Sequence, residues 1–348
     1  MRNFRDRDFL QTGEGFFFCV VGPIHPPDRI ISYIKYVPSS SGIWKDKEKR
    51  FSRILPKYTI PNLLETFKYI EQNFPNYLFH SPVDNITMTA VPHESIKTHF
   101  KPEVKLSMLR QNSDLDSLQE KLIRFTRFLE EISGVSESQF GVTGSILIDI
   151  HHPKFSDLDI TVYGTKNSWM LKKALTENRH STISMKRLEG KLLEEWCIKK
   201  SQDYPLTPKE ALEIYKRKWN LGFFENTWVS IHPVKLENEV KEKYGKKSYI
   251  PFGQVTIEAV VQGNVDSLFL PAIYQIKEVK FLDGQQVCDV SEVVSYEGLY
   301  DSIAEDGEKI QTKGKLEKIN ETATSGQKYR VIVGSAEGKG KEYIKVVE

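Results

Sequence analysis

Two aspartates one residue apart, Asp157 and Asp159, interrupt a stretch that otherwise has the composition of a buried strand, "SDLDITVYG". Residues i and i+2 of a strand point to the same side, so the two carboxylates are predicted to lie side by side and to repel each other. A cation between them removes the repulsion, and paired carboxylate oxygens form the hard site that Mg²⁺ prefers. The pair therefore predicts a site for Mg²⁺ or Mn²⁺.

A glycine-serine pair, Gly144-Ser145, lies shortly upstream of these acids. Glycine allows a close backbone approach, and Ser145 is predicted to begin a helical turn whose N–H groups and hydroxyl hold phosphate. It is not a Walker A loop, because no Gly-Lys-Ser/Thr follows. A phosphate-binding turn beside paired carboxylates is the equipment of metal-assisted phosphoryl or nucleotidyl transfer.

These two motifs resemble the signature of the nucleotidyltransferase superfamily of DNA polymerase β, poly(A) polymerases and CCA-adding enzymes. That signature is a strand ending in Gly-Ser, a short spacer, and Asp-x-Asp in a second strand; Gly144-Ser145 and "SDLDI" match it in order, after a predicted helix. The whole chain also resembles a set of archaeal proteins described as predicted nucleotidyltransferases. The resemblance implies that Ser145 and nearby amides hold the triphosphate of an NTP. It also implies that Asp157 and Asp159 hold two metal ions, one activating an acceptor hydroxyl and the other stabilising pyrophosphate.

The chain departs from this family pattern at the third carboxylate, which family members usually carry on a later strand. The next suitable strand, "TWVSIHPVK", offers Ser230 and His232 but no acid. Glu258 in "QVTIEAVV" is the substitute that we predict as the third catalytic acid, with a structural ion pair as the alternative.

The arginine that often follows Gly-Ser in the family is also missing, since Ile146 stands there. We predict that Lys154 and Arg187 supply this nucleotide-binding charge, and Arg179 and Lys186 are alternatives.

Three further motifs have simpler interpretations. Adjacent His151 and His152 would face opposite ways in a strand, so a polar loop is favoured over a metal pair. A proline-fixed turn is favoured for "GPIHPPDR", residues 22–29, with a contribution to a substrate cleft as the alternative. Residues 216–219, "KRKW", predict a solvated helix face with one buried ring; the alternative is a basic strip for a nucleic-acid strand.

Elements with clear periodicity position these motifs and predict an α/β (α+β) protein of three regions. An N-terminal α+β region, 1–110, has strands at 16–22 and 29–37, a helix at 60–74 and then extended, proline-punctuated chain. A nucleotidyltransferase-like mixed sheet with flanking helices fills 111–245. A β-rich domain, in which a small barrel is one option, fills 246–348. In the second region we expect helices at 115–133, 167–178 and 207–222 and strands at 139–145, 157–164 and 227–236; in the third we expect strands at 254–263, 272–282, 313–319 and 328–335.

Bulk composition limits the functional classes. The 348 residues carry a formal net charge of +2, so any contact with nucleic acid must come from a local patch. Three scattered cysteines argue against disulfides and against a thiolate zinc site, and favour a cytoplasmic protein. We expect no signal peptide and no membrane span.

The function that these observations predict is Mg²⁺-dependent transfer of a nucleotide from an NTP to an acceptor hydroxyl. An RNA end is the first acceptor to consider, and a protein side chain or a small molecule are others. The alternative is a non-catalytic nucleotide- or nucleic-acid-binding protein on a degenerate scaffold of the same fold. The oligomeric state stays open.

Overall fold

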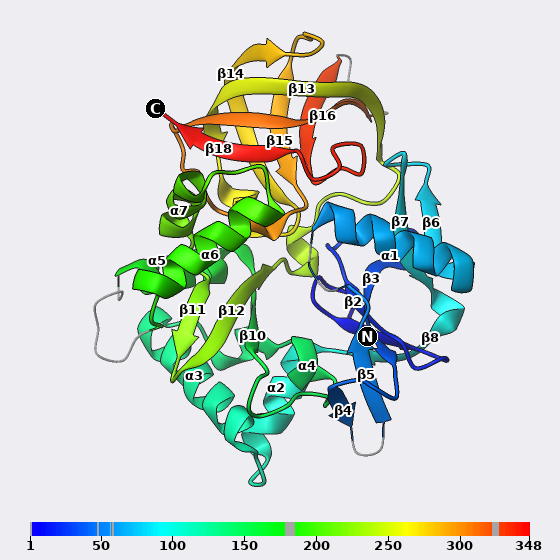
Figure 1. Ribbon diagram of the computed structural model, residues 1–348, viewed down its shortest axis with the longest axis vertical. Coiled ribbons are helices and arrows are strands. Elements are labelled where there is room, and N and C mark those ends of the chain that lie inside the picture. Colours follow the sequence, from blue (N-terminus) through cyan, green and yellow to red (C-terminus); the bar gives the residue numbers. More distant parts are fainter. Residues whose placement is uncertain (1, 47–48, 56, 58, 178–184, 322–326) are drawn as a thin grey trace.

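Three β-sheets follow one another along the chain and define its architecture. The computed structural model describes residues 2–46, 49–55, 57, 59–177, 185–321 and 327–348. Within that part of the chain the sheets lie in residues 9–100, 140–234 and 247–347, each inside one of the three predicted regions. In Figure 1 the blue N-terminal sheet is at the right, the second sheet with its helices is at the lower left, and the C-terminal strands are at the top. The predicted mixed α and β class is confirmed.

The N-terminal sheet has the strand order β4-β5-β3-β2-β1-β8, and β7 pairs with both β3 and β6. The predicted strands at 16–22 and 29–37 are β2 and β3, and the predicted helix at 60–74 is α1. Ile70 of α1 packs against Phe18 and Ile34, so the helix is held on the sheet by its apolar face. The elements are β1 (Phe9–Thr12), β2 (Phe17–Val20), β3 (Arg29–Pro38), β4 (Trp44–Asp46), β5 (Lys49–Arg53), α1 (Ile60–Asn73), β6 (Leu78–Ser81), β7 (Ile86–Pro92) and β8 (Ile96–Phe100).

The expectation of extended chain up to residue 110 is wrong, because Pro102–Gln111 form a helix, α2. Pro102 occupies its first turn, where the missing N–H is not needed. Leu106 and Leu109 are buried in the core of the second region, so this helix ties the first two regions together. Glu103 of α2 strengthens the connection by accepting hydrogen bonds from Arg2 near the N-terminus.

The second sheet has the strand order β11-β12-β10-β9 and is built from β9 (Phe140–Val142), β10 (Leu158–Tyr163), β11 (Leu221–Phe224) and β12 (Thr227–Val234). Strand β10 runs antiparallel to β9 and parallel to β12. Most β10 side chains are buried, as expected for a central strand. Strand β10, which carries Asp159, therefore lies between β9 and β12 in the middle of the sheet.

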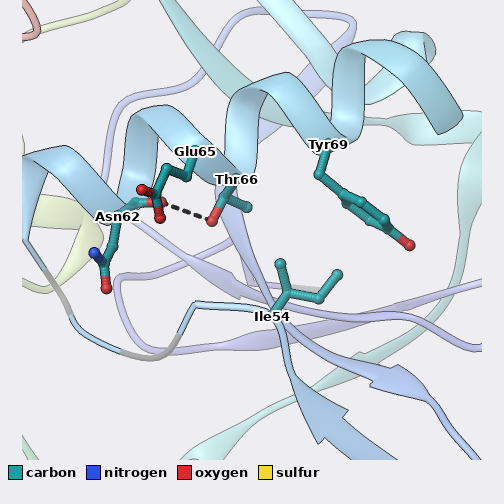
Figure 2. Close-up of a pocket in the computed structure, with 5 residues that line it drawn as sticks. All are labelled: Ile54, Asn62, Glu65, Thr66 and Tyr69. Carbon is teal, nitrogen blue, oxygen red and sulfur yellow. Dashed lines mark hydrogen bonds between the residues drawn. The ribbon is translucent and has the colours of Figure 1, made fainter.

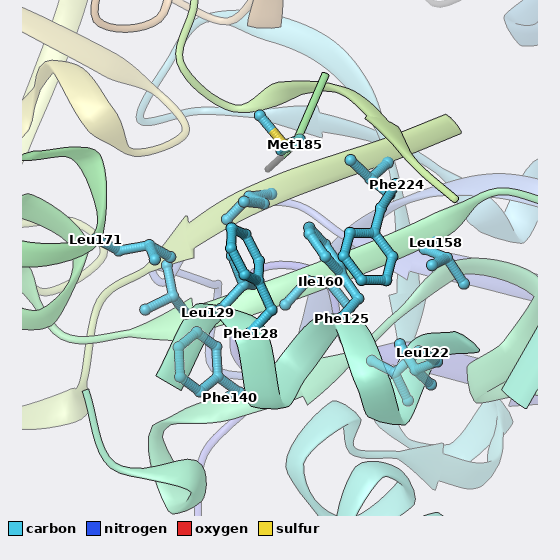
Figure 3. Close-up of a cluster of buried hydrophobic side chains, with 14 of the residues drawn as sticks. Leu122, Phe125, Phe128, Leu129, Phe140, Leu158, Ile160, Leu171, Met185 and Phe224 are labelled. Carbon is cyan, nitrogen blue, oxygen red and sulfur yellow. The ribbon is translucent and has the colours of Figure 1, made fainter. Parts of the chain in front are cut away.

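Helix α3 (Ser117–Ser133) is the most regular element and confirms the predicted helix at 115–133. Asp116 and Gln119 form a reciprocal capping box at its start, and Gly134 ends it in the left-handed conformation. Figure 3 shows Phe125 and Phe128 of this helix directed at the sheet, against Phe224. This packing covers one face of the sheet that carries the candidate site.

Three longer helices of the second region follow β10 in the described chain: α5 (Thr165–Glu177), α6 (Gly190–Asp203) and α7 (Pro208–Arg217). Helices α5 and α7 were predicted and α6 was not. The predicted helix at 207–222 runs too far, because α7 ends at Arg217 and strand β11 begins at Leu221. Trp219 between them is buried in the core, as predicted for one ring.

The expected solvated face at residues 216–219 is wrong for Lys218, which is buried and binds Asp301 at 2.5 Å. Arg217 binds Glu308 at 2.6 Å, and Lys216 binds Glu213 within its own helix. Two of the three cations therefore attach α7 to the C-terminal domain instead of forming a basic strip.

The C-terminal sheet closes into the small barrel that was one option. Its order is β13-β14-β15-β17-β16, and β13 also pairs with β16, so the ring of five strands is complete; β18 adds to β16. Closure removes the exposed edges that open sheets present. The strands are β13 (Lys247–Gly263), β14 (Ala272–Asp283), β15 (Val290–Ser295), β16 (Lys309–Glu321), β17 (Lys328–Val333) and β18 (Tyr343–Val347).

Candidate functional site

The Gly-Ser motif forms a tight turn directly against strand β10. Strand β9 ends at Val142, and a one-turn helix, α4 (Gly144–Leu147), follows Thr143. The Thr143 N–H donates to the Asp159 carbonyl at 2.9 Å. Gly144 has a φ of +69°, and a Cβ at this position would overlap the Asp159 carboxylate. The predicted helical turn is present and begins at Gly144, the residue that lies against Asp159.

Asp159 is partly buried on β10, with 24% of its side chain exposed. Ser230, its register partner on β12, donates a hydrogen bond to Oδ1 at 2.5 Å. His232 Nε2 lies 3.8 Å from the same oxygen. Burial by itself would raise the pKa of Asp159, but His232, Lys35 and Ser230 outweigh it and hold the pKa well below its usual range. Asp159 is therefore ionised at neutral pH.

The hydrogen bonds of Ser230 assign the tautomer of His232. The ionised Asp159 can only accept, so the single hydroxyl proton of Ser230 goes to it. The 2.9 Å contact between Ser230 Oγ and His232 Nε2 must then have the imidazole as donor. Burial, and then the positive charge of Arg7, lower the pKa of His232 and favour the neutral ring. His232 thus orients Ser230 toward Asp159 from the same strand, β12.

Asp157 stands immediately before β10, at an exposed position. Desolvation and then the neighbouring Asp159 raise the pKa of Asp157 to about 6, although the charges of Arg53 and Lys35 oppose the rise. The repulsion predicted between the two carboxylates is therefore present, and it is the kind of repulsion that a bound cation relieves.

Cations from the N-terminal region act on the acid pair, and the sequence reasoning missed them. Lys35 of β3 acts on both aspartates and Arg53 of β5 acts on Asp157. Arg7 has a φ of +69° and its carbonyl accepts the Thr143 hydroxyl at 2.7 Å. No local pattern marks these residues, because they lie on other strands or turns more than a hundred residues upstream. The site thus lies where the first two regions meet.

Of the predicted nucleotide-binding residues, Gly144 lies against Asp159, and the contacts that the structure describes for the others are with groups outside the acid pair. Ser145 is buried, and its carbonyl accepts the Ile150 N–H. Lys154 lies on the exposed loop before Asp157. Arg187 donates to the carbonyls of Tyr215 and Lys218 at the end of α7, which gives it a structural contact. Arg179 lies outside the described residues, and Lys186 pairs through its backbone with Phe223.

Glu258 belongs to a different sheet from the acid pair. It lies in β13 of the C-terminal barrel, in register with Lys280 and Gln311. Strand β13 pairs with β14 on one side and with β16 on the other, so it cannot also pair with β10 or β12. Glu258 is therefore not a strand neighbour of Asp159. The β12 residues beside β10 at this place are Ser230, opposite Asp159, and His232, opposite Thr161.

The other histidine motifs are structural. His151 Nε2 lies 2.7 Å from Asp116, the residue that caps α3, and His152 stacks on Phe155 with ring centroids 4.4 Å apart. The predicted polar loop is confirmed. In the 22–29 turn, His25 Nδ1 accepts the Ile31 N–H at 3.3 Å, and burial lowers the pKa of His25 to about 4.

The donor set fits a hard divalent cation only in part. Asp157 and Asp159 supply the carboxylate oxygens that Mg²⁺ and Mn²⁺ prefer. Among the described residues, no group of three or more histidine, cysteine or acidic side chains is arranged to hold a metal. Mg²⁺ commonly binds through one or two carboxylates together with substrate phosphates and water. The two aspartates therefore suffice as protein ligands only if the substrate completes the site.

A separate pocket of about 260 Å³ lies against α1, lined by Ile54, Asn62, Glu65, Thr66 and Tyr69. Figure 2 shows a single acid, Glu65, among these side chains, and the Thr66 hydroxyl bonds to a backbone carbonyl of its own helix. This surface hollow holds none of the acid pair, so we assign it no part in the chemistry.

Comparison with known proteins finds one informative relative. The chain is 31% identical over 353 residues to "Uncharacterized protein MJ1086" of Methanocaldococcus jannaschii, and the match covers 98% of each protein. No known protein-family profile matches the chain, and no solved structure matches it. None of the described helices reaches the length and apolarity that crossing a bilayer requires.

Proposed function

We propose that this chain, which belongs to the same family as MJ1086 of Methanocaldococcus jannaschii, is a Mg²⁺- or Mn²⁺-dependent nucleotidyltransferase. It would transfer a nucleotide from an NTP to an acceptor hydroxyl. The observation that carries the proposal is the apposition of Gly144 and Asp159, with Asp157 beside them. A glycine at the start of a helical turn, held against one of two neighbouring carboxylates, suits a ligand that brings phosphate and a divalent cation together.

Each residue of the site has a role in this proposal. Asp157 and Asp159 would hold the divalent ions, which would supply Lewis acidity to the acceptor hydroxyl and to the pyrophosphate leaving group. Ser230 fixes the orientation of the Asp159 carboxylate, and His232 fixes Ser230. Positive charge from the N-terminal region, at Lys35 above all, offsets the negative charge that the phosphates add.

An RNA end is the first acceptor to test. The support is an analogy at the level of the fold, since small cores of the resembled superfamily commonly hold RNA with appended domains. Here an N-terminal α+β region and a C-terminal barrel flank the core. A protein side chain or a small molecule would be tested in the same assay.

The second candidate is a protein that binds nucleotides or nucleic acid without catalysis. The specific observation in its favour is the pair Ser230 and His232 on β12, where the resembled family carries a third carboxylate. Such a protein would bind an NTP with a divalent cation and would not transfer the nucleotide.

The deciding experiment incubates the protein with each α-labelled NTP, Mg²⁺ or Mn²⁺, and total cellular RNA and protein. Transfer of label that depends on the metal and is lost in Asp157→Ala/Asp159→Ala supports the enzyme. Asp149→Asn is a matched control, because Asp149 is an exposed aspartate on the same connection, at a positive φ that asparagine tolerates. Binding of an NTP without transfer supports the second candidate. Undiminished labelling by the double variant excludes the two aspartates from the reaction.

A further inference from the structure

A row of ring and guanidinium groups, which we call the aromatic row, leads to the acid pair. It consists of Arg53 and Trp44 from the N-terminal sheet and Phe155 and His152 from the loop before β10. The Arg53 guanidinium lies 4.7 Å from the Trp44 ring centroid. Trp44 meets Phe155 nearly edge-on at 6.3 Å, and Phe155 stacks on His152 at 4.4 Å with an interplanar angle of 13°.

The row is fixed in position and still accessible. Phe155 and Ser156 each donate a backbone hydrogen bond to the His152 carbonyl, at 3.2 and 3.0 Å, and the Ser156 hydroxyl accepts the His152 N–H at 2.9 Å. These bonds form a compact turn that holds the Phe155 ring. Even so, Phe155 is 47% exposed, which is unusual for a phenylalanine.

The row is also continuous with the proposed site. Phe155 precedes Asp157 by two residues, and Arg53 is close enough to Asp157 for its charge to favour the ionised carboxylate. Planar rings with an arginine beside them are the surface on which proteins stack nucleobases, because every base has a π face. This surface combines an exposed ring, Phe155, with the positive charge of Arg53 acting on Asp157.

We propose that the aromatic row binds a nucleobase, with Phe155 as the stacking ring. The inference rests on the proposed function, because a nucleotide must be the ligand. The base belongs either to the NTP or to the last nucleotide of an RNA acceptor, and the chemistry of stacking is the same for both. Arg53, at the Trp44 end of the row, supplies positive charge that acts on Asp157 and so favours the phosphates of the same nucleotide.

The test compares binding of three probes to the full-length protein with Mg²⁺ present: α,β-methylene NTP analogues, inorganic tripolyphosphate and a short single-stranded RNA. The analogues cannot be cleaved at the bond in question, and tripolyphosphate has no base. The variants are Phe155→Ala, Phe155→Tyr, which keeps a ring, and Tyr69→Ala, which removes an exposed ring 41% accessible on α1. Circular dichroism checks that each variant is folded.

We expect Phe155→Ala to weaken binding of the NTP analogue or of the RNA about tenfold, while Phe155→Tyr and Tyr69→Ala bind as the wild type does. Weakening of the analogue alone assigns the base of the NTP, and weakening of the RNA alone assigns the base of the acceptor. Tripolyphosphate should bind all variants equally. The inference is overturned if Phe155→Ala weakens tripolyphosphate binding as much as binding of the analogue or RNA, or if it weakens binding of neither the analogue nor the RNA. Either result leaves the proposed function standing. Failure of the wild type to bind any probe overturns both.

Discussion

The backbone of Gly144 lies against the carboxylate of Asp159, so closely that a Cβ at residue 144 would overlap the carboxylate oxygen. Two segments create this contact: the turn after β9, and strand β10, which pairs with β9 through register partners such as Val142 and Ile160. Only a residue without a side chain permits it, and the φ of +69° at Gly144 is also one that glycine adopts without strain.

Gly144→Ala tests this contact. The alanine methyl displaces Asp159, and the left-handed backbone conformation costs roughly 1–2 kcal/mol in the free energy of unfolding. We expect nucleotide transfer to be lost together with this destabilisation, measured by label transfer and by urea denaturation. Gly13→Ala is the control, since nothing lies within 4 Å of a Cβ there. Wild-type transfer by Gly144→Ala would show that the apposition has no functional role.

Ser230→Ala removes the hydroxyl that donates to Asp159 and leaves the carboxylate in place. Partners that orient a metal ligand typically contribute about 10–100-fold to metal affinity or activity. We expect an apparent Mg²⁺ affinity or a transfer rate reduced to this extent, with the unfolding curve little changed. Titration of the cation in the labelling assay measures the effect. Ser138→Ala, at an exposed serine, should leave both quantities unaltered, and an equal response from the two variants would contradict the orienting role.

Glu297 predicts a pH dependence of stability in the C-terminal domain. Its side chain is buried, and one carboxylate oxygen has no hydrogen-bond partner. Burial, and then repulsion from Glu342, raise the pKa of Glu297 from 4.5 to about 8, against the effect of Lys200. Between these two pH values the folded state keeps a proton that the unfolded state loses. The contribution of this proton to the free energy of unfolding is therefore fully present below pH 4.5 and is lost as the pH rises to about 8.

Glu297→Gln removes this ionisation. We expect the free energy of unfolding of the variant, relative to that of the wild type, to rise by about 1 kcal/mol per pH unit between pH 4.5 and about 8. Above pH 8 this difference between the two proteins should stay constant. Urea denaturation at pH 5, 7 and 9 measures the gap. Glu278→Gln, at an exposed glutamate, removes one charge from the surface of the same barrel for comparison. A gap that stays the same from pH 5 to 9 would contradict the assignment.

Lys218 predicts a large loss of stability at the junction of α7 and the barrel. Its ammonium binds Asp301 at 2.5 Å and the Gly298 carbonyl at 2.8 Å inside the protein. Lys218→Ala leaves these acceptors without their cation, which costs about 3–5 kcal/mol for a buried pair. Lys216→Ala, two residues away on the exposed face, should cost less than about 1 kcal/mol. Chemical denaturation compares the two, and similar losses would show that Lys218 is not a structural tie.

Short-range patterns in the sequence predicted the elements that present the candidate site. The 3.6-residue spacing of Leu118, Leu122 and Phe125 identified α3, and the glycine at 134 marked its end. The order of Gly-Ser and Asp-x-Asp placed the turn and strand β10 next to each other. These predictions succeed because helical periodicity, capping and strand alternation depend on residues only a few positions apart.

The surroundings of the acid pair were decided only by the tertiary structure. Whether a given cation faces Asp157 depends on how the N-terminal sheet packs against the second sheet, across roughly a hundred residues of chain. Lys35 and Arg53 reach the site in this way. Arg187 and Glu258 look equally suitable in the sequence and are held elsewhere by the end of α7 and by the barrel. The sequence by itself determined the identity of the acids and of the turn beside them. The partners of that site followed from packing between sheets, because contacts between distant segments leave no periodic trace in either segment.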